Sequence, residues 1–160
     1  TEGMNLVRAG SGGAVTLHPG EIRHLSPDLK PTWTREVHVL ILAVDEKKKR
    51  ALAVPFSPLS TPAFETELAS GLADASLAVL CLWNSAWIPL HQACRSWLVT
   101  SADDALMQDI AELRASLAKN EGPPARLADR VGSTLAHPQD PRQSYADEEE
   151  NLLDELEELM

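Results

Sequence analysis

The sequence has little of what holds together small disulfide-rich or zinc-binding domains. Only two of its 160 residues are cysteines, Cys81 and Cys94. Two cysteines are too few for a disulfide framework, and neither has His or Cys partners at zinc-binding spacing. We therefore expect no metal and no cofactor, and a reducing cytoplasm is the expected compartment.

Long apolar runs and catalytic motifs are also missing. No run approaches the roughly 20 apolar residues that a membrane-spanning helix needs, so no membrane contact is expected. The first 15 residues lack the basic and then apolar build of a signal peptide. No phosphate-binding loop, dinucleotide fingerprint, zinc-protease motif or nucleophile elbow occurs. No catalytic motif in the sequence therefore identifies a reaction.

Basic residues are absent from the C-terminal end. Residues 145–160 hold eight acids, whereas the whole chain has 24 acids and 14 bases. Removing the tail leaves 16 acids against 14 bases, a net charge of −2 over residues 1–144. The acidity belongs to the tail, so the acidic balance of the whole chain does not exclude a nucleic-acid partner for the domain.

Composition divides the chain into four segments. Glycines dominate residues 1–13, which we expect to be a flexible lead. Residues 14–118 hold the runs that can form one core, since 44% of the chain is hydrophobic. Prolines mark residues 119–144 as a linker, with a turn or two of helix possible in 126–135. Residues 145–160 form an acidic amphipathic segment.

Short β-type runs in the domain predict a mainly β fold with helix, of the α+β class. Strands are expected at residues 21–25, 36–44, 50–56, 64–68, 77–83 and 95–100, with a turn-like stretch after residue 85. The run EVHVLILAV at 36–44 is typical of a strand buried on both faces. The run FETEL at 64–68 alternates apolar and polar residues, as a half-buried strand does.

One long helix is expected near the end of the domain. Ser101 to Asp104 resembles a capping box. Leucine and isoleucine then recur at helical spacing, which predicts a helix to about Ala118.

One basic cluster stands out. It consists of Lys47, Lys48, Lys49 and Arg50. Two interpretations fit it: a solvated hairpin tip, or a contact for nucleic-acid phosphates. Trp33 lies in a polar, proline-rich loop beside Arg35, and an exposed Trp there can stack on a base.

The order of these runs resembles the MazF/PemK/Kid toxin family. Gly20-Glu21-Ile22, a loop and Arg35 before the strand REVHVLIL are similar to the opening of that family. LAVPFS, AFETEL, SLAVLCLWNSAWIP and VTSADDALMQDIAELRASL follow in the family's order. The resemblance covers roughly residues 18–118.

The resemblance implies an SH3-like curved barrel closed by a C-terminal helix, which pairs as a homodimer and cuts single-stranded RNA without metal. The family's arginine falls on Arg35, and its hydroxyl residue falls on Ser57. An arginine fork can hold the scissile phosphate and stabilise the charge that develops on it. The basic cluster and Trp33 would then contact the RNA.

Some family positions differ in this chain. The proline after the arginine is Glu36 here, and the acid or amide pair of a later strand falls near Cys81 and Leu82. These departures keep a second interpretation open. In it the barrel is a non-catalytic protein-interaction module, and the tail is a docking or autoinhibitory element.

The tail places apolar side chains on one helical face, with acids around the rest. The face consists of Leu152, Leu153, Leu156, Leu159 and Met160. Either the tail is a solvated end, or it is a helix that lies apolar face inward in a groove. In the toxin family that the sequence resembles, acidic antitoxin segments cover the RNA-binding groove of the toxin. In the second of these two interpretations, the tail contacts its own domain, an antitoxin or another protein partner.

Overall fold

The computed structural model of the protein describes residues 17–26, 36–59, 61–132 and 142–157. The strands are β1 Glu21–His24, β2 His38–Asp45, β3 Arg50–Pro55, β4 Glu67–Ala69, β5 Val79–Cys81, β6 Ala86–Pro89 and β7 Trp97–Ser101. The helices are α1 Leu90–Arg95, α2 Asp104–Ala118 and α3 Arg142–Glu157, with short 3₁₀ turns η2 Ala75–Leu77, η3 Leu82–Asn84 and η4 Ala125–Arg130. The protein is thus a mixed α+β fold, as the sequence predicts.

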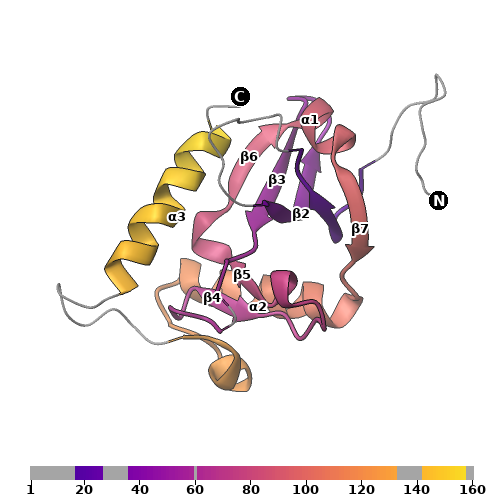
Figure 1. The fold of residues 1–160 in the computed structure, drawn as a ribbon. Coiled ribbons are helices and arrows are strands. Elements are labelled where there is room, and N and C mark those ends of the chain that lie inside the picture. The colour runs from indigo at the N-terminus through magenta and orange to yellow at the C-terminus, as the bar shows by residue number, and fades with distance from the viewer. Residues whose placement is uncertain (1–16, 27–35, 60, 133–141, 158–160) are drawn as a thin grey trace.

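A five-stranded antiparallel sheet forms the centre of the molecule (Figure 1). Its strand order is β6-β3-β2-β1-β7, and β4 and β5 form a separate antiparallel pair. In Figure 1, α2 lies below the sheet beside this pair, whereas α3 lies along the side formed by β6. No helix of the described residues is long and apolar enough to cross a membrane.

Alternation along β2 creates two separate cores, one on each face of the sheet. Val39 and Ile41 belong to one cluster, and Leu40 and Leu42 contact the other. Successive side chains of a strand point to opposite faces, so a run of apolar residues must be covered twice. The expected strand buried on both faces is confirmed. Helix α2 supplies the cover on one face, and α3 helps to cover the other.

Two expectations about local structure were wrong. Ser101 does not cap α2, because it pairs with Glu21 as the last residue of β7. The cap is Asp103, whose Oδ1 accepts a hydrogen bond of 2.8 Å from Leu106 N. The turn-like stretch after residue 85 instead forms β6 and α1, and β6 pairs with β3. A four-residue edge strand ending in proline is too short to show an alternating pattern.

Gly132 allows the chain after η4 to lie directly against the segment before β4. Its N–H donates to Phe64 O at 2.8 Å. A Cβ at this position would lie 2.4 Å from the backbone of Ala63 and Phe64, so no larger residue fits. On the far side of residues 133–141, Arg142 donates to Ala63 O at 2.5 Å. Both ends of that segment therefore meet the same short stretch of backbone.

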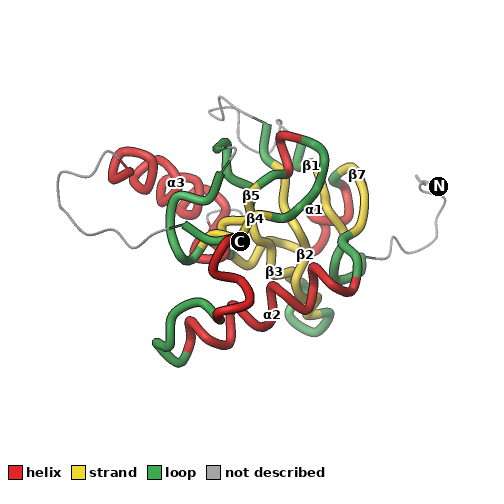
Figure 2. The backbone as a smooth tube through the Cα atoms, turned by 90° about the horizontal axis from the view of Figure 1, so that it is seen from below, coloured by secondary structure: helices red, strands yellow, loops and turns green. Residues whose placement is uncertain are grey.

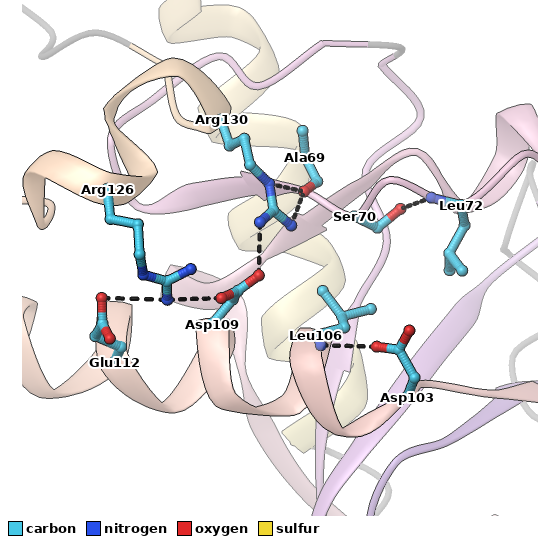
Figure 3. A network of polar contacts seen from close by, with 9 residues as sticks. All are labelled: Ala69, Ser70, Leu72, Asp103, Leu106, Asp109, Glu112, Arg126 and Arg130. Carbon is cyan, nitrogen blue, oxygen red and sulfur yellow. Dashed lines mark hydrogen bonds and ion pairs between the residues drawn. The ribbon is translucent and has the colours of Figure 1, made fainter.

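A polar network fastens η4 to α2 and β4 (Figure 3). Arg130 forms an ion pair with Asp109 at 2.5 Å and donates to Ala69 O at 3.0 Å. Arg126 pairs with the same carboxylate at 2.7 Å and with Glu112 at 3.3 Å. The hydrogen bond from Arg130, followed by that from Arg126, lowers the pKa of Asp109. Asp109 therefore joins both arginines of η4 to α2.

We expect Arg130→Ala to destabilise the fold more than Arg126→Ala. Arg130 is the less exposed side chain, 33% against 53%, and it also binds a strand carbonyl. Its loss should lower the free energy of unfolding by about 1.5–3 kcal/mol, as for hydrogen bonds to charged groups. The loss at Arg126 should be smaller because solvent screens that pair. Urea denaturation of both variants measures the order, and the reverse order would contradict the network's assigned role.

Candidate functional site

The acidic helix α3 lies along one side of the domain (Figures 1 and 2). Leu156 is fully buried and Leu152 is 5% exposed, both in one core cluster with Ile88 of β6. Leu153 packs against the same cluster, whereas Leu159 lies outside the described residues. The tail is therefore a docked helix over residues 142–157, and part of its apolar face completes the core.

Near its first turn, α3 reaches a polar cluster through Tyr145. The Tyr145 Oη atom lies 2.8 Å from Ser57 Oγ, 2.7 Å from Glu67 Oε2 and 3.1 Å from Cys81 Sγ. A phenol has a single proton, and a carboxylate only accepts. We therefore assign the phenol proton to Glu67, with the Ser57 hydroxyl donating to the phenol oxygen.

Glu67 is the centre of this cluster. Its side chain is fully buried. It accepts hydrogen bonds of 2.9 Å from both Ala63 N and Trp83 Nε1, in addition to that from Tyr145. In the β4–β5 pair it stands directly opposite Cys81. The FETEL pattern predicted a half-buried strand, but α3 covers the side on which Glu67 lies, so the acid is buried.

The thiol and the phenol of the cluster are both held in their protonated forms. Burial, and then the negative charge of Glu67, raises the pKa of Cys81 well above its usual range. Burial, followed by the interaction with Cys81, raises the pKa of Tyr145 well above its usual range. Cys81 is therefore no thiolate nucleophile here. The arrangement is a buried acid whose two side-chain oxygens accept hydrogen bonds from neutral donors.

Aromatic rings cover the cluster on one side. The Tyr145 ring stacks on Phe64 at a centroid distance of 5.9 Å, and Trp83 meets Phe64 edge-on at 6.2 Å. The guanidinium of Arg142 lies 5.3 Å from the centre of the Phe64 ring. Phe64 is thus a platform that the first turn of α3 covers.

Further along α3, the helix contacts a buried amide side chain, Asn84, and buries one of its own acids, Glu149. Asn84, which is fully buried, donates to the backbone O of Glu149 at 2.7 Å. The Oδ1 atom of Asn84 has no hydrogen-bond partner among the described residues. Glu149 itself is only 2% exposed, with a carboxylate oxygen 3.8 Å from Cys81 Sγ. Burying Asn84 Oδ1 without such a partner costs free energy, which offsets part of the stability that the docking of α3 provides.

Ser57, the predicted hydroxyl residue, belongs to this cluster. It is 3% exposed, and its Oγ atom accepts a hydrogen bond of 3.0 Å from Leu59 N. The predicted Arg35 and Trp33 lie outside the described residues.

The predicted basic cluster lies elsewhere. Lys47, Lys48 and Lys49 are exposed in the turn between β2 and β3. Arg50 stacks on Trp87, 3.9 Å from the ring centre, and faces Asp45 at 3.4 Å. Ser57 follows the opposite end of β3, about 20 Å away along an extended strand. The structure does not bring the hairpin to Ser57.

Two residues of the cluster, Glu67 and Tyr145, were not predicted from the sequence. Tyr145 is the only tyrosine of the chain and stands near the start of the amphipathic helix, which is the signal that marks it. Glu67 had no comparable signal, because an acid in an alternating strand normally faces solvent. Within the described part of the chain, no group of His, Cys, Asp or Glu side chains is arranged to hold a metal ion.

Comparisons with protein-family models, with curated proteins and with solved structures found no match. Function is therefore inferred from the geometry around Ser57 and from the residues that carry the toxin-family resemblance.

We expect Tyr145→Phe to lower the free energy of unfolding by about 1–3 kcal/mol, because it removes one hydrogen-bond partner from buried Glu67 and one from Ser57. The matched control is Asn151→Ala, an exposed position on the same helix, with an expected change within about 0.5 kcal/mol. Chemical denaturation of both variants measures the difference. Equal stability of Tyr145→Phe and the native chain would mean that the phenol contributes no net hydrogen bond.

Proposed function

We propose that this chain is a divergent toxin–antitoxin protein of the MazF/PemK type, a metal-independent endoribonuclease acting on single-stranded RNA. In this proposal, its acidic C-terminal helix covers its own site. The observation that carries the proposal is the contact between Tyr145 of α3 and Ser57, the residue at the family's hydroxyl position. A helix that bonds to this one side chain is placed to control it.

The proposal includes the SH3-like curved barrel. An isolated bridge between Phe56 and Leu80 links the end of β3 to β5. The five-stranded sheet and the β4–β5 pair thus share one core, to which α2 contributes Leu106, Ile110 and Leu113. This arrangement supports a curved sheet closed by α2. A homodimer and a cytoplasmic location are further parts of the proposal that follow from the resemblance.

The roles in cleavage follow the resemblance. Arg35 binds the scissile phosphate and stabilises its developing charge. Ser57 positions a substrate oxygen beside it. Lys47, Lys48 and Lys49 are exposed, so they contribute sequence-independent contacts to RNA phosphates away from the cut.

The docked helix keeps RNA from this site in two ways. Ser57 is 3% exposed with α3 in place, so no substrate atom reaches it. The acids of α3 also repel phosphates. The buried Asn84 Oδ1, for which the described residues offer no hydrogen-bond partner, weakens the docking of the helix. Cleavage therefore requires α3 to leave the domain, and the missing hydrogen bond at Asn84 Oδ1 lowers the free energy that this release costs.

One observation favours the alternative of a non-catalytic interaction module. The Glu67 carboxylate lies beside Ser57, bridged by Tyr145 Oη, and puts negative charge where a phosphate would bind. In that alternative, α3 leaves its own domain to dock on a protein partner, such as an antitoxin. RNA cleavage separates the two functions.

We expect Tyr145→Ala in the full chain to raise RNA cleavage in the presence of EDTA about 30-fold over the native protein. Losing the hydroxyl and ring contacts weakens the docked state by about 2 kcal/mol, which changes the population of the open state by that factor. Adding Ser57→Ala or Arg35→Ala should abolish the gain. Gel analysis of a mixed-sequence single-stranded RNA measures cleavage.

Asn151→Ala is the control on the same helix and should cleave at the native rate. Circular dichroism confirms folding, and the rate of trypsin cleavage after Arg142 reports release of α3. A folded Tyr145→Ala protein with a released helix and no cleavage of RNA would overturn the ribonuclease and leave the interaction module.

A further inference from the structure

We propose that Glu67, Ser57 and Phe64 form a ribonucleotide-binding site, with Glu67 as the base that accepts the proton of a ribose 2′-hydroxyl. We further propose that Tyr145 occupies this site as an internal stand-in for the nucleotide. This inference rests on the proposed function and extends it to residues that the family resemblance does not assign.

The contacts of Tyr145 are those of a bound hydroxyl ligand. Its Oη atom lies between Ser57 Oγ and Glu67 Oε2, at 2.8 and 2.7 Å. The hydroxyl donates to a carboxylate and accepts from a second hydroxyl, as the 2′-hydroxyl of ribose can. When α3 leaves, it takes this hydroxyl away, and Glu67 Oε2 loses one of its two hydrogen-bond donors while keeping Trp83 Nε1. A substrate hydroxyl restores the lost bonds.

Glu67 is held in place for proton transfer. Ala63 N fixes Oε1, and Trp83 Nε1 fixes Oε2, each at 2.9 Å. Neither donor belongs to α3, so both remain when the helix leaves. The carboxylate oxygen that bonds to Tyr145 is therefore already oriented toward the place of the substrate hydroxyl. A general base needs such a position within hydrogen-bond reach of the proton that it removes.

Phe64 supplies a surface for the base of the nucleotide. The Tyr145 ring stacks on it with an angle of 23° between the ring planes. A nucleobase can take the same place, because stacking on an aromatic side chain accepts every base. The site would thus bind single-stranded RNA, whose bases are free to leave a stack.

The proposed step is an internal transfer within the RNA. The 2′-oxygen forms a bond to the adjacent phosphorus as its proton passes to Glu67. The bond from phosphorus to the 5′-oxygen breaks, and that oxygen takes a proton from water. Glu67 then releases its proton to the resulting hydroxide. The products are a 2′,3′-cyclic phosphate and a free 5′-hydroxyl.

The test compares variants of the full chain that all carry Tyr145→Ala. We expect Glu67→Gln to lower the rate of metal-free RNA cleavage about 100-fold or more, the usual contribution of a general base. The fall in rate toward acidic pH should also disappear. Glu67→Asp keeps a carboxylate and should retain that pH dependence at a reduced rate. Glu121→Gln, an exposed acid, is the matched control and should cleave like its parent.

A second measurement concerns binding and needs no cleavage. Fluorescence anisotropy compares an RNA oligonucleotide with DNA of the same sequence. The Tyr145→Ala chain should bind the RNA about tenfold more tightly than the DNA. Only RNA has the 2′-hydroxyl that donates a hydrogen bond to the Glu67 carboxylate. The preference should be lost in Glu67→Gln.

The outcomes separate the two proposals. Cleavage at an unchanged rate in folded Glu67→Gln would overturn the role of Glu67 and leave the ribonuclease standing. Equal affinity of the Tyr145→Ala chain for RNA and DNA would overturn the hydroxyl site, even if Glu67→Gln does not fold. Absence of cleavage by a folded parent with a released helix would overturn the proposed function, and with it the role of Glu67 as a base.

Discussion

A buried carboxylate governs the arrangement of this molecule. Glu67 is removed from water, and a buried carboxylate is tolerated only when hydrogen-bond donors surround it. Its donors come from three parts of the chain: the nearby backbone at Ala63, Trp83 in η3 and the distant Tyr145 in α3. The first two hold the acid within the domain. The third requires the C-terminal helix to lie where it does, so the position of the helix and the burial of the acid depend on each other.

The same helix completes a core and closes a site. Because β2 is apolar on both faces, the sheet must be covered twice, and Leu152 and Leu156 provide part of the second cover. Release of α3 exposes them again, at about 1.5–3 kcal/mol for each side chain. The Asn84 Oδ1 atom, which has no hydrogen-bond partner in the described part of the chain, offsets part of this stabilisation. In the proposed function, binding of RNA or of a protein partner supplies the remaining free energy that the release of α3 requires.

The departures from the toxin family acquire a physical interpretation from the register of β4 and β5. The family's acid or amide pair falls near Cys81 and Leu82, which carry no such group. Glu67 stands directly opposite Cys81 on the neighbouring strand, so a carboxylate lies close to that place after all. Under the proposed function, Glu67 supplies from the neighbouring strand the acid that the resemblance leads one to expect near Cys81.

Local patterns determined the elements with strong periodicity. The run EVHVLILAV specified a strand buried on both faces, the spacing of Leu106, Ile110 and Leu113 specified α2, and the leucines of the tail specified an amphipathic helix. Strand β6 and α1 escaped prediction because each has at most six residues, too few to show a period. The predicted N-cap of α2 was wrong because Ser101 pairs with Glu21 in the sheet. Only the tertiary structure decided which surface the tail helix covers and that Glu67 is buried beneath it. Burial and hydrogen bonding join residues that are far apart in sequence, such as Tyr145 and Ser57, and no local pattern encodes that contact.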